Sequence, residues 1–318
     1  MKRLLFLLII SLCFACRDNR SLLKEPNSEE QLGELLFFDP ILSSDSTISC
    51  ASCHKPELAF SDNSAVSIGV GGKKGTRNTP SAMNQSGRNF MFWDGHTETL
   101  EEQAMGPIEN PIEMNLPISV VIDRLYRHPQ YLSFFNKIYN EKPNRVTIGK
   151  AIAAYEHTLE TGDTPFDDYM KKGDTTEFRK SEQRGQDIFN VKGKCFDCHF
   201  GPDFTTDLFR NIGLFNGKDL NDSGRFIVTR KWDDLGKFKT PGLRNIAMTS
   251  PYMHNGMHKT LREVIDYYNE PDKFIKNSIN RDTLLNKPLG LTEADKKDLE
   301  NFLLSLTDRR FKKVGLAP

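Results

Sequence analysis

The chain carries the pentapeptide Cys-x-x-Cys-His twice, as CASCH at 50–54 and as CFDCH at 195–199. In each copy two thiols lie three positions apart and an imidazole follows directly. The other two of the six cysteines, Cys13 and Cys16, lie near the N-terminus. Cys-x-x-Cys pairs serve in disulfides, in zinc sites or in haem attachment, so these three uses have to be compared.

Spacing separates the three uses. Zinc sites made from two such pairs bring them to within about 20 residues of each other, whereas Cys195 follows Cys53 by 142 positions. Redox dithiols occur singly in a βαβ setting, which this sequence does not show. Two thiols on one helical turn can reach both vinyl groups of a porphyrin, and the next His can bind its iron. The motifs therefore predict two covalent c-type haems, held by Cys50, Cys53 and His54 and by Cys195, Cys198 and His199.

The first residues have the character of an export signal. Two basic residues precede a run at 4–12 that is apolar apart from Ser11; it is shorter than the roughly 20 residues that span a bilayer and fits a secretory signal. The change to polar sequence at Cys16 resembles a bacterial lipoprotein signal, although Cys13 stands where such signals usually carry Leu. We predict a signal peptide at 1–15 and a polar tether at 16–30. The protein would be periplasmic and anchored by a lipid on Cys16, with ordinary cleavage and a soluble periplasmic protein as the alternative.

The surroundings of the two motifs repeat as well. Q-x-G-x-x-Leu/Ile-Phe precedes each one, at 31–37 and at 183–189, and reads as an amphipathic helix in which Gly33 and Gly185 allow close helix packing. We predict a mainly α fold of two cytochrome c-like haem domains with long irregular loops. The N-terminal domain would cover 31–163 and the C-terminal domain 164–318.

Helical periodicity elsewhere agrees with that fold. In 147–160 the residues Ile148, Ile152, Tyr155 and Leu159 share one face. The segment from Thr292 begins with a capping pattern, because Asp295 follows three positions later. Lys and Arg total 43 against 43 Asp and Glu, so no basic excess predicts a nucleic-acid partner.

Between about 30 and 306 the chain resembles the bacterial di-haem cytochrome c peroxidase and MauG family. The segments that carry the resemblance are CASCH, GTRNTPS (75–81), FWDGHTETLEEQAMGPIENPIEM (92–114), CFDCH, FKTPGLRN (238–245) and PYMHNG (251–256). The resemblance implies that peroxide reacts at the N-terminal haem and that the C-terminal haem accepts electrons and passes them inward.

An iron that activates peroxide needs one open face. In many relatives a His placed 16 residues after the proximal His fills that face in the resting enzyme. Here the count from His54 ends at Val70, which cannot bind iron. The next His, His96, occupies a position that the family usually fills with Arg. We therefore expect a five-coordinate, high-spin N-terminal haem that needs no reductive activation.

The resemblance also implies the catalytic residues. Glu113 matches the family's acid/base, with a pKa raised by an apolar pocket, and Gln103 matches the residue that orients peroxide. Trp93 matches the tryptophan between the two haems. His254 is expected to line the peroxide pocket.

The sixth ligand of the second iron is harder to predict from the sequence. Spacing alone suggests Met253 or Met257, because small c-type cytochromes commonly use Met. Alignment with the family points instead to Tyr268, as in MauG, and a phenolate would lower the potential. Tyr267, Met257 and His258 are the alternatives.

The family also holds Ca²⁺ between its domains. The side-chain ligand matches Asn78, and the backbone ligands match Thr249 and Pro251; such oxygen donors suit a hard cation. His128 and His157 are expected to be surface or helix-packing residues.

The resulting prediction is an oxidoreductase, a di-haem c-type peroxidase that reduces hydrogen peroxide to water. Its electron donor would be a small periplasmic protein, a cytochrome c or a cupredoxin, and family members are often homodimers. The first alternative is a MauG-like enzyme that oxidises a protein substrate through a high-valent haem state. The second is a pure electron carrier with two six-coordinate haems, which would leave Gln103 and Glu113 unexplained.

Overall fold

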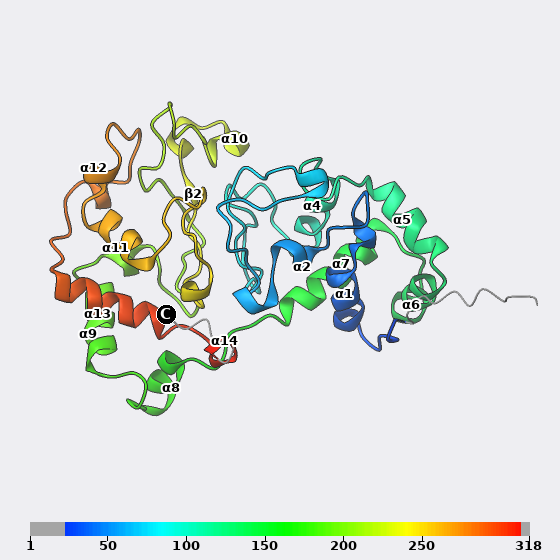
Figure 1. Cartoon of the computed structure of the whole chain (residues 1–318), viewed down its shortest axis with the longest axis horizontal. Helices are drawn as coiled ribbons and strands as arrows, with labels where there is room; N and C mark the ends of the chain where they lie inside the picture. The colour runs from blue at the N-terminus through cyan, green and yellow to red at the C-terminus, as the bar shows by residue number, and fades with distance from the viewer. Residues whose placement is uncertain (1–22, 313–318) are drawn as a thin grey trace, which may run out of the picture.

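The computed structural model describes residues 23–312, and these form two lobes that lie side by side (Figure 1). The predicted signal peptide and Cys16 lie outside the described residues. Helices dominate both lobes, as the sequence predicted. The first lobe contains α1 (Glu29–Phe38), α2 (Cys50–Cys53), α3 (Leu100–Gln103), α4 (Met105–Glu109), α5 (Ile118–Arg127), α6 (Pro129–Tyr139) and α7 (Arg145–His157).

The second lobe adds seven α-helices and the two strands found in the described part of the chain. The strands β1 (Phe209–Arg210) and β2 (Phe238–Lys239) pair antiparallel, with Phe209 opposite Lys239. The helices are α8 (Pro165–Lys172), α9 (Lys180–Asn190), α10 (Phe226–Thr229), α11 (Leu261–Asn269), α12 (Pro271–Phe274), α13 (Glu293–Leu304) and α14 (Arg309–Lys312). Within residues 23–312 no helix is long and apolar enough to cross a membrane.

Each lobe is built around one pair of closely packed helices. A Cβ added to Gly33 on α1 would lie 1.8 Å from the carbonyl oxygen of Ala151 on α7. A Cβ added to Gly185 on α9 would lie 2.0 Å from the carbonyl oxygen of Asp298 on α13. Only glycine permits this approach of two backbones, so the predicted role of both glycines is confirmed.

The ends of these helices follow from local sequence. The Ser28 side chain accepts a hydrogen bond from Gln31 N and so caps α1. At α13, Thr292 and Asp295 form the predicted reciprocal capping box. Such caps satisfy the first free N–H groups of a helix.

Two separate apolar cores fill the lobes. The first lies around α1 and α7 and includes Phe37, Phe135 and Ile152. The second lies around α9 and α13 and includes Phe189 and Phe302. The chain passes from one lobe to the other between α7 and α8, and Phe311 on α14 returns to the first core. We propose the predicted boundary near residue 163 as the division between two haem domains.

Ion pairs join the two lobes. Arg77 donates to Asp94 of its own lobe at 2.6 Å and, through Nε and Nη2, to both carboxylate oxygens of Asp222 in the other lobe at 2.7 and 2.8 Å. Arg88 reaches Asp203 across the same boundary at 2.7 Å. These contacts fix the walls of the space between the lobes.

Candidate active site

One cavity of about 630 Å³ opens between the lobes and reaches both Cys-x-x-Cys-His motifs. Its lining includes the side chains of all six motif residues identified above: Cys50, Cys53, His54, Cys195, Cys198 and His199. The lining is mostly apolar, with a few polar groups. A concave apolar space with few directed polar groups is typical of a cofactor site.

The first motif is held by α2. Ser49 caps this helix and His54 is its C-terminal cap. His54 Nδ1 donates to the carbonyl of Phe60 at 3.1 Å, which leaves Nε2 as the free lone pair. Burial lowers the pKa of His54, so the imidazole is neutral and can bind a metal.

The second motif repeats this geometry. His199 Nδ1 donates to the carbonyl of Phe204 at 2.9 Å, and burial lowers its pKa too. None of the four motif cysteines forms a disulfide. Burial raises the pKa of Cys50 and of Cys195 to about 12.

These residues fit covalent haem. Each motif offers two unpaired thiols on one turn and a neutral imidazole whose second nitrogen is already oriented by a backbone carbonyl, the arrangement that haem-ligating His requires. In the described part of the chain no cluster of three or more His, Cys, Asp or Glu could hold a bare metal ion. The cavity therefore suits two porphyrins better than zinc.

Glu113 enters the cavity from the segment that follows α4. Its carboxylate oxygen Oε1 accepts a hydrogen bond from Asn110 Nδ2 at 2.7 Å. The orientation of that amide is fixed, because Asn110 Oδ1 accepts from Ile112 N at 3.1 Å. Burial raises the pKa of Glu113, and the Asn110 hydrogen bond and the charge of His96 oppose that effect. Gln103, at the end of α3, lines the same cavity.

The loop at 67–75 closes against Glu113. Val70 N donates to the Glu113 carbonyl at 2.8 Å, and Lys73 Nζ donates to the Pro111 carbonyl at 2.8 Å. A Cβ on Gly69 would lie 2.2 Å from the carbonyl oxygen of Ile112, so the two backbones touch. The Val70 side chain is buried, and the loop contributes no imidazole to the cavity.

His96 also lines the cavity. Its ring stacks on Phe92 with centroids 4.2 Å apart, and its Nδ1 lies 2.6 Å from a carboxylate oxygen of Asp94. Asp94 is thus shared between His96 and Arg77, and this pairing keeps the pKa of Asp94 at about 2 although burial opposes it.

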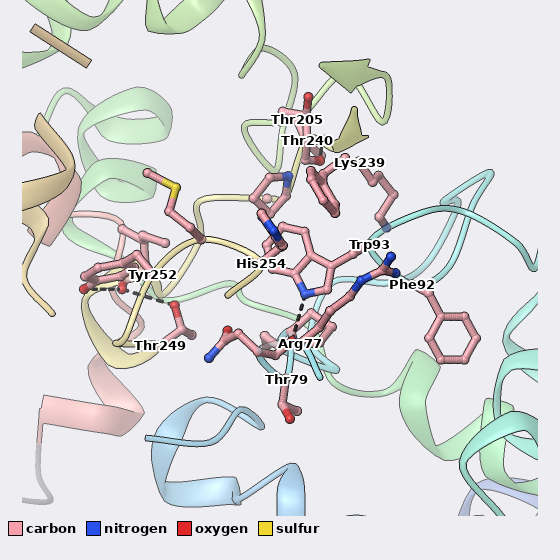
Figure 2. Close-up of a pocket in the computed structure, with 18 of the residues that line it drawn as sticks. Arg77, Thr79, Phe92, Trp93, Thr205, Lys239, Thr240, Thr249, Tyr252 and His254 are labelled. Carbon is pink, nitrogen blue, oxygen red and sulfur yellow. Dashed lines mark hydrogen bonds between the residues drawn. The ribbon is translucent and has the colours of Figure 1, made fainter. Parts of the chain in front are cut away.

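Trp93 lies between the lobes. Its Nε1 donates to the Asn78 carbonyl at 2.8 Å, and its own carbonyl accepts from Lys239 N of the second lobe at 2.7 Å. Figure 2 shows its ring beside that of His254, with centroids 6.4 Å apart. His254 in turn stacks on Phe238 at 3.7 Å. A continuous row of aromatic rings therefore crosses the boundary.

The structure distinguishes between the two tyrosines of α11. Tyr267 is fully buried and donates to the Ile212 carbonyl at 2.5 Å, so its hydroxyl is already satisfied. Tyr268 lines the cavity and interacts electrostatically with Cys195 and Cys198. Met253 also lines the cavity, while Met257 and His258 do not.

The expected calcium ligands all line the cavity. Asn78 is buried and its Nδ2 donates to the Ser64 carbonyl at 3.0 Å, so its Oδ1 remains available. The carbonyls of Thr249 and Pro251 accept no hydrogen bond from a residue that the structure describes. Oxygen atoms without donors suit Ca²⁺. Of the two remaining His, His157 is exposed on α7 and His128 packs on Tyr131 at 5.1 Å.

Three features escaped the sequence analysis. Asn110 lies only three positions before Glu113, and an Asn at that distance was a usable signal. The Asp94–Arg77–Asp222 bridge could not be predicted, because Asp222 follows Arg77 by 145 positions. Glu156, a buried acid on α7, also lines the cavity.

Fold and site together define a c-type cytochrome with two haem-binding motifs facing one shared cavity. The family model described as di-haem cytochrome c peroxidase matches residues 27–176. The methylamine utilization protein MauG of Methylorubrum extorquens is 37% identical over 86% of this chain and 77% of its own. The cytochrome c551 peroxidase of Pseudomonas aeruginosa is 37% identical over 76% and 72%. A solved MauG-like protein associated with microbial copper homeostasis superposes with a TM-score of 0.80 at 32% identity, covering 92% of both chains.

The chain belongs to the di-haem cytochrome c peroxidase family. It is an oxidoreductase of that type with two c-type haems, as the two motifs predicted.

Proposed function

We propose that the protein reduces hydrogen peroxide to water at the N-terminal haem, with electrons from a small periplasmic redox protein that enter through the C-terminal haem. The observation that carries this proposal is a built acid/base group. Glu113 is held by an oriented Asn110 amide, and Glu113 and Gln103 both line the cavity that contains His54. A pure electron carrier has no use for such a pair.

The reaction consumes two electrons and two protons for each peroxide and yields two waters. Bound at His54, the haem supplies the electron exchange with peroxide. Gln103 orients the peroxide by hydrogen bonding. Glu113 accepts the proton from one peroxide oxygen and returns it to the oxygen that leaves as water, which is general acid–base catalysis. Because Val70 and not an imidazole lies on the 67–75 loop, the N-terminal iron would be five-coordinate and high-spin in the resting protein.

The electron path and the sixth ligand of the second iron also belong to this proposal. Trp93 and the adjacent His254 would couple the two haems, and Tyr268 would be the sixth ligand of the second iron, since it faces the cavity that Tyr267 does not reach. Asn78, Thr249 and Pro251 would hold Ca²⁺ near Trp93. The family's location supports a periplasmic protein, and the lipid anchor on Cys16 and a homodimer remain proposals.

The test is the variant Glu113→Gln, which keeps size and loses the titrating group. We expect peroxide turnover with a reduced cytochrome c to fall by roughly 10²–10⁴-fold, while the haem content stays at two per chain. Glu109→Gln, at a nearby exposed residue paired with Arg145, is the matched control and should keep full turnover. Near-normal turnover of the Glu113 variant would remove the assignment.

The pH profile gives a second readout. Glu113 must be ionised to accept a proton, and burial raises its pKa above 4.5. Activity of the wild type should therefore decline with falling pH at values above 4.5, and Glu113→Gln should lack this limb. An electron paramagnetic resonance spectrum with only low-spin ferric haem would contradict the open N-terminal iron.

Oxidation of a protein substrate is the second candidate function. The identity of 37% to a MauG, the Val at position 70 and the position of Tyr268 favour it. Stopped-flow spectroscopy after one equivalent of peroxide, without donor, separates the two: a peroxidase needs its donor for rapid multiple turnover, whereas a protein-oxidising enzyme keeps the oxidising equivalents for a long time.

A further inference from the structure

Glu156 is a buried acid that the proposed reaction does not use. It lies in the last turn of α7 and is 6% exposed, and it lines the cavity on the side of the first motif. Burial is the main cause of the raised pKa of the Cys50 thiol, and a charge on Glu156 adds to it, so the two groups interact. The Glu156 side chain makes no hydrogen bond and no ion pair with any residue from 23 to 312. An unpaired acid at such a depth is costly and calls for a reason.

The second lobe shows that packing does not require an acid here. Gly33 contacts Ala151 and Tyr155 of α7 in the same way as Gly185 contacts Asp298 and Phe302 of α13. Ala151 of the first lobe thus corresponds to Asp298 of the second, and Tyr155 corresponds to Phe302. By the same alignment Glu156 corresponds to Leu303. Leu303 lines the cavity beside the second motif, as Glu156 does beside the first. An apolar side chain therefore fills the equivalent position.

The surroundings of Glu156 favour its neutral form. Burial raises its pKa to about 8. The titratable groups that interact with it are Cys50 from α2 and Tyr155 from its own helix, and both are uncharged at neutral pH. With no cation beside it, the protonation of Glu156 responds to any change of charge in the same cavity, because Coulomb interactions are strong in a poorly solvated site.

We propose that Glu156 is a proton-exchange site coupled to the N-terminal haem. At pH values where Glu156 is ionised in the oxidised protein, it binds a proton from solvent when an electron enters that haem from the donor, and it releases the proton when the electron leaves. One electron and one proton enter together, so the net charge of the buried site is unchanged. Glu156 would thus be a positioning residue that makes the midpoint potential of the N-terminal haem depend on pH. The C-terminal haem, which has Leu303 at the equivalent position, would lack this coupling. The inference rests on the two haems and holds for a peroxide or a protein substrate.

The test is a spectroelectrochemical titration of the intact di-haem protein from about pH 6 to about pH 10. For the wild type we expect the midpoint potential of the N-terminal haem to fall with rising pH. The limit for one proton per electron is a tenfold change per pH unit, about 59 mV. The isosteric Glu156→Gln and the framework-matched Glu156→Leu should both flatten this slope. The C-terminal haem serves as the internal control, and Glu160→Gln, at an exposed acid four positions further along the chain, serves as the surface control.

A slope that is the same in the wild type and in Glu156→Gln would overturn the proposal, because a structural role would shift the potential without changing its pH dependence. Reduced-minus-oxidised infrared spectra of the wild type give a second, mutation-free readout. A protonated-carboxyl signal that rises on reduction and is lost in Glu156→Gln supports the proposal, and its absence from the wild type contradicts it. Both readouts are independent of peroxide turnover, so failure here leaves the role of Glu113 untouched.

Discussion

Gly33 makes the closest approach between two helices of the framework, so the substitution Gly33→Ala should destabilise the first lobe. The added Cβ would lie 1.8 Å from the Ala151 carbonyl oxygen and 2.9 Å from the Tyr155 Cβ, and both partners are held by α7. Since Cβ contacts below 3.0 Å do not occur, α1 and α7 would have to separate by about 1.2 Å. Overpacking of a rigid core costs about 1–3 kcal/mol, and we expect the upper end because the obstacle is backbone.

The loss would appear as a lower unfolding temperature. For a cooperative unit of about 150–250 residues, each kcal/mol of lost stability lowers the unfolding temperature by about 2–4 °C. A loss of about 3 kcal/mol should therefore make Gly33→Ala unfold roughly 6–12 °C below the wild type. The spectrum of the first haem should change as well, because Phe37 on α1 lies 6.4 Å from the His54 ring. The second haem should be unaffected.

The matched control is Gly162→Ala. A Cβ at Gly162 would meet nothing within 4 Å, and the substitution should change stability by less than about 1 kcal/mol, in the stabilising direction. Circular dichroism in the far ultraviolet and in the Soret region, followed through thermal and guanidinium unfolding, measures both variants. If Gly33→Ala unfolds within about 0.5 kcal/mol of the wild type, close helix packing does not hold the first lobe.

Two other predictions concern the second haem and the boundary between the lobes. Tyr268→Phe should alter the optical and paramagnetic spectra of the second haem, and unchanged spectra would exclude Tyr268 as a ligand. Tyr267→Phe should leave the spectra unchanged and cost about 1 kcal/mol, because the partly buried Ile212 carbonyl loses its donor. A double-mutant cycle on Arg77→Ala and Asp222→Ala should give a coupling energy of roughly 1–3 kcal/mol, since two hydrogen bonds join these partly buried groups, and a value near zero would mean that this bridge does not fix the lobes.

Features set by short stretches of sequence were predicted correctly. The capping box at Thr292 and the buried face of α7 are decided within a few residues by hydrogen bonding and helical period. The role of Gly33 and Gly185 was also readable, because the same pattern occurs twice. Contacts between distant parts of the chain could not be predicted from the sequence. The Asp222 carboxylate, for example, meets Arg77 only because the two lobes lie against each other.

Glu156 shows where a readable signal was missed. The period that places Ile148 and Ile152 on the buried face of α7 places the residue four positions after Ile152 there too. An acid on the apolar face of a helix is a departure from the pattern, and such departures are expected at functional positions. The sequence could identify the anomaly, although only the cavity reveals that it faces the first motif.

The duplicated framework limits where the difference between the two haems can arise. Both proximal sides are alike: a glycine seats one helix on another, and each motif His donates through Nδ1 to a phenylalanine carbonyl. Residues that differ between the two lobes outside these shared features must therefore carry the distinction in chemistry. In the first lobe these are the 67–75 loop and the segment that bears Gln103 and Glu113, and in the second lobe it is α11 with Tyr268. The proposed open iron with its acid/base group and the proposed ligated iron would follow from these segments, and exchanging proximal residues between the lobes should not exchange their roles.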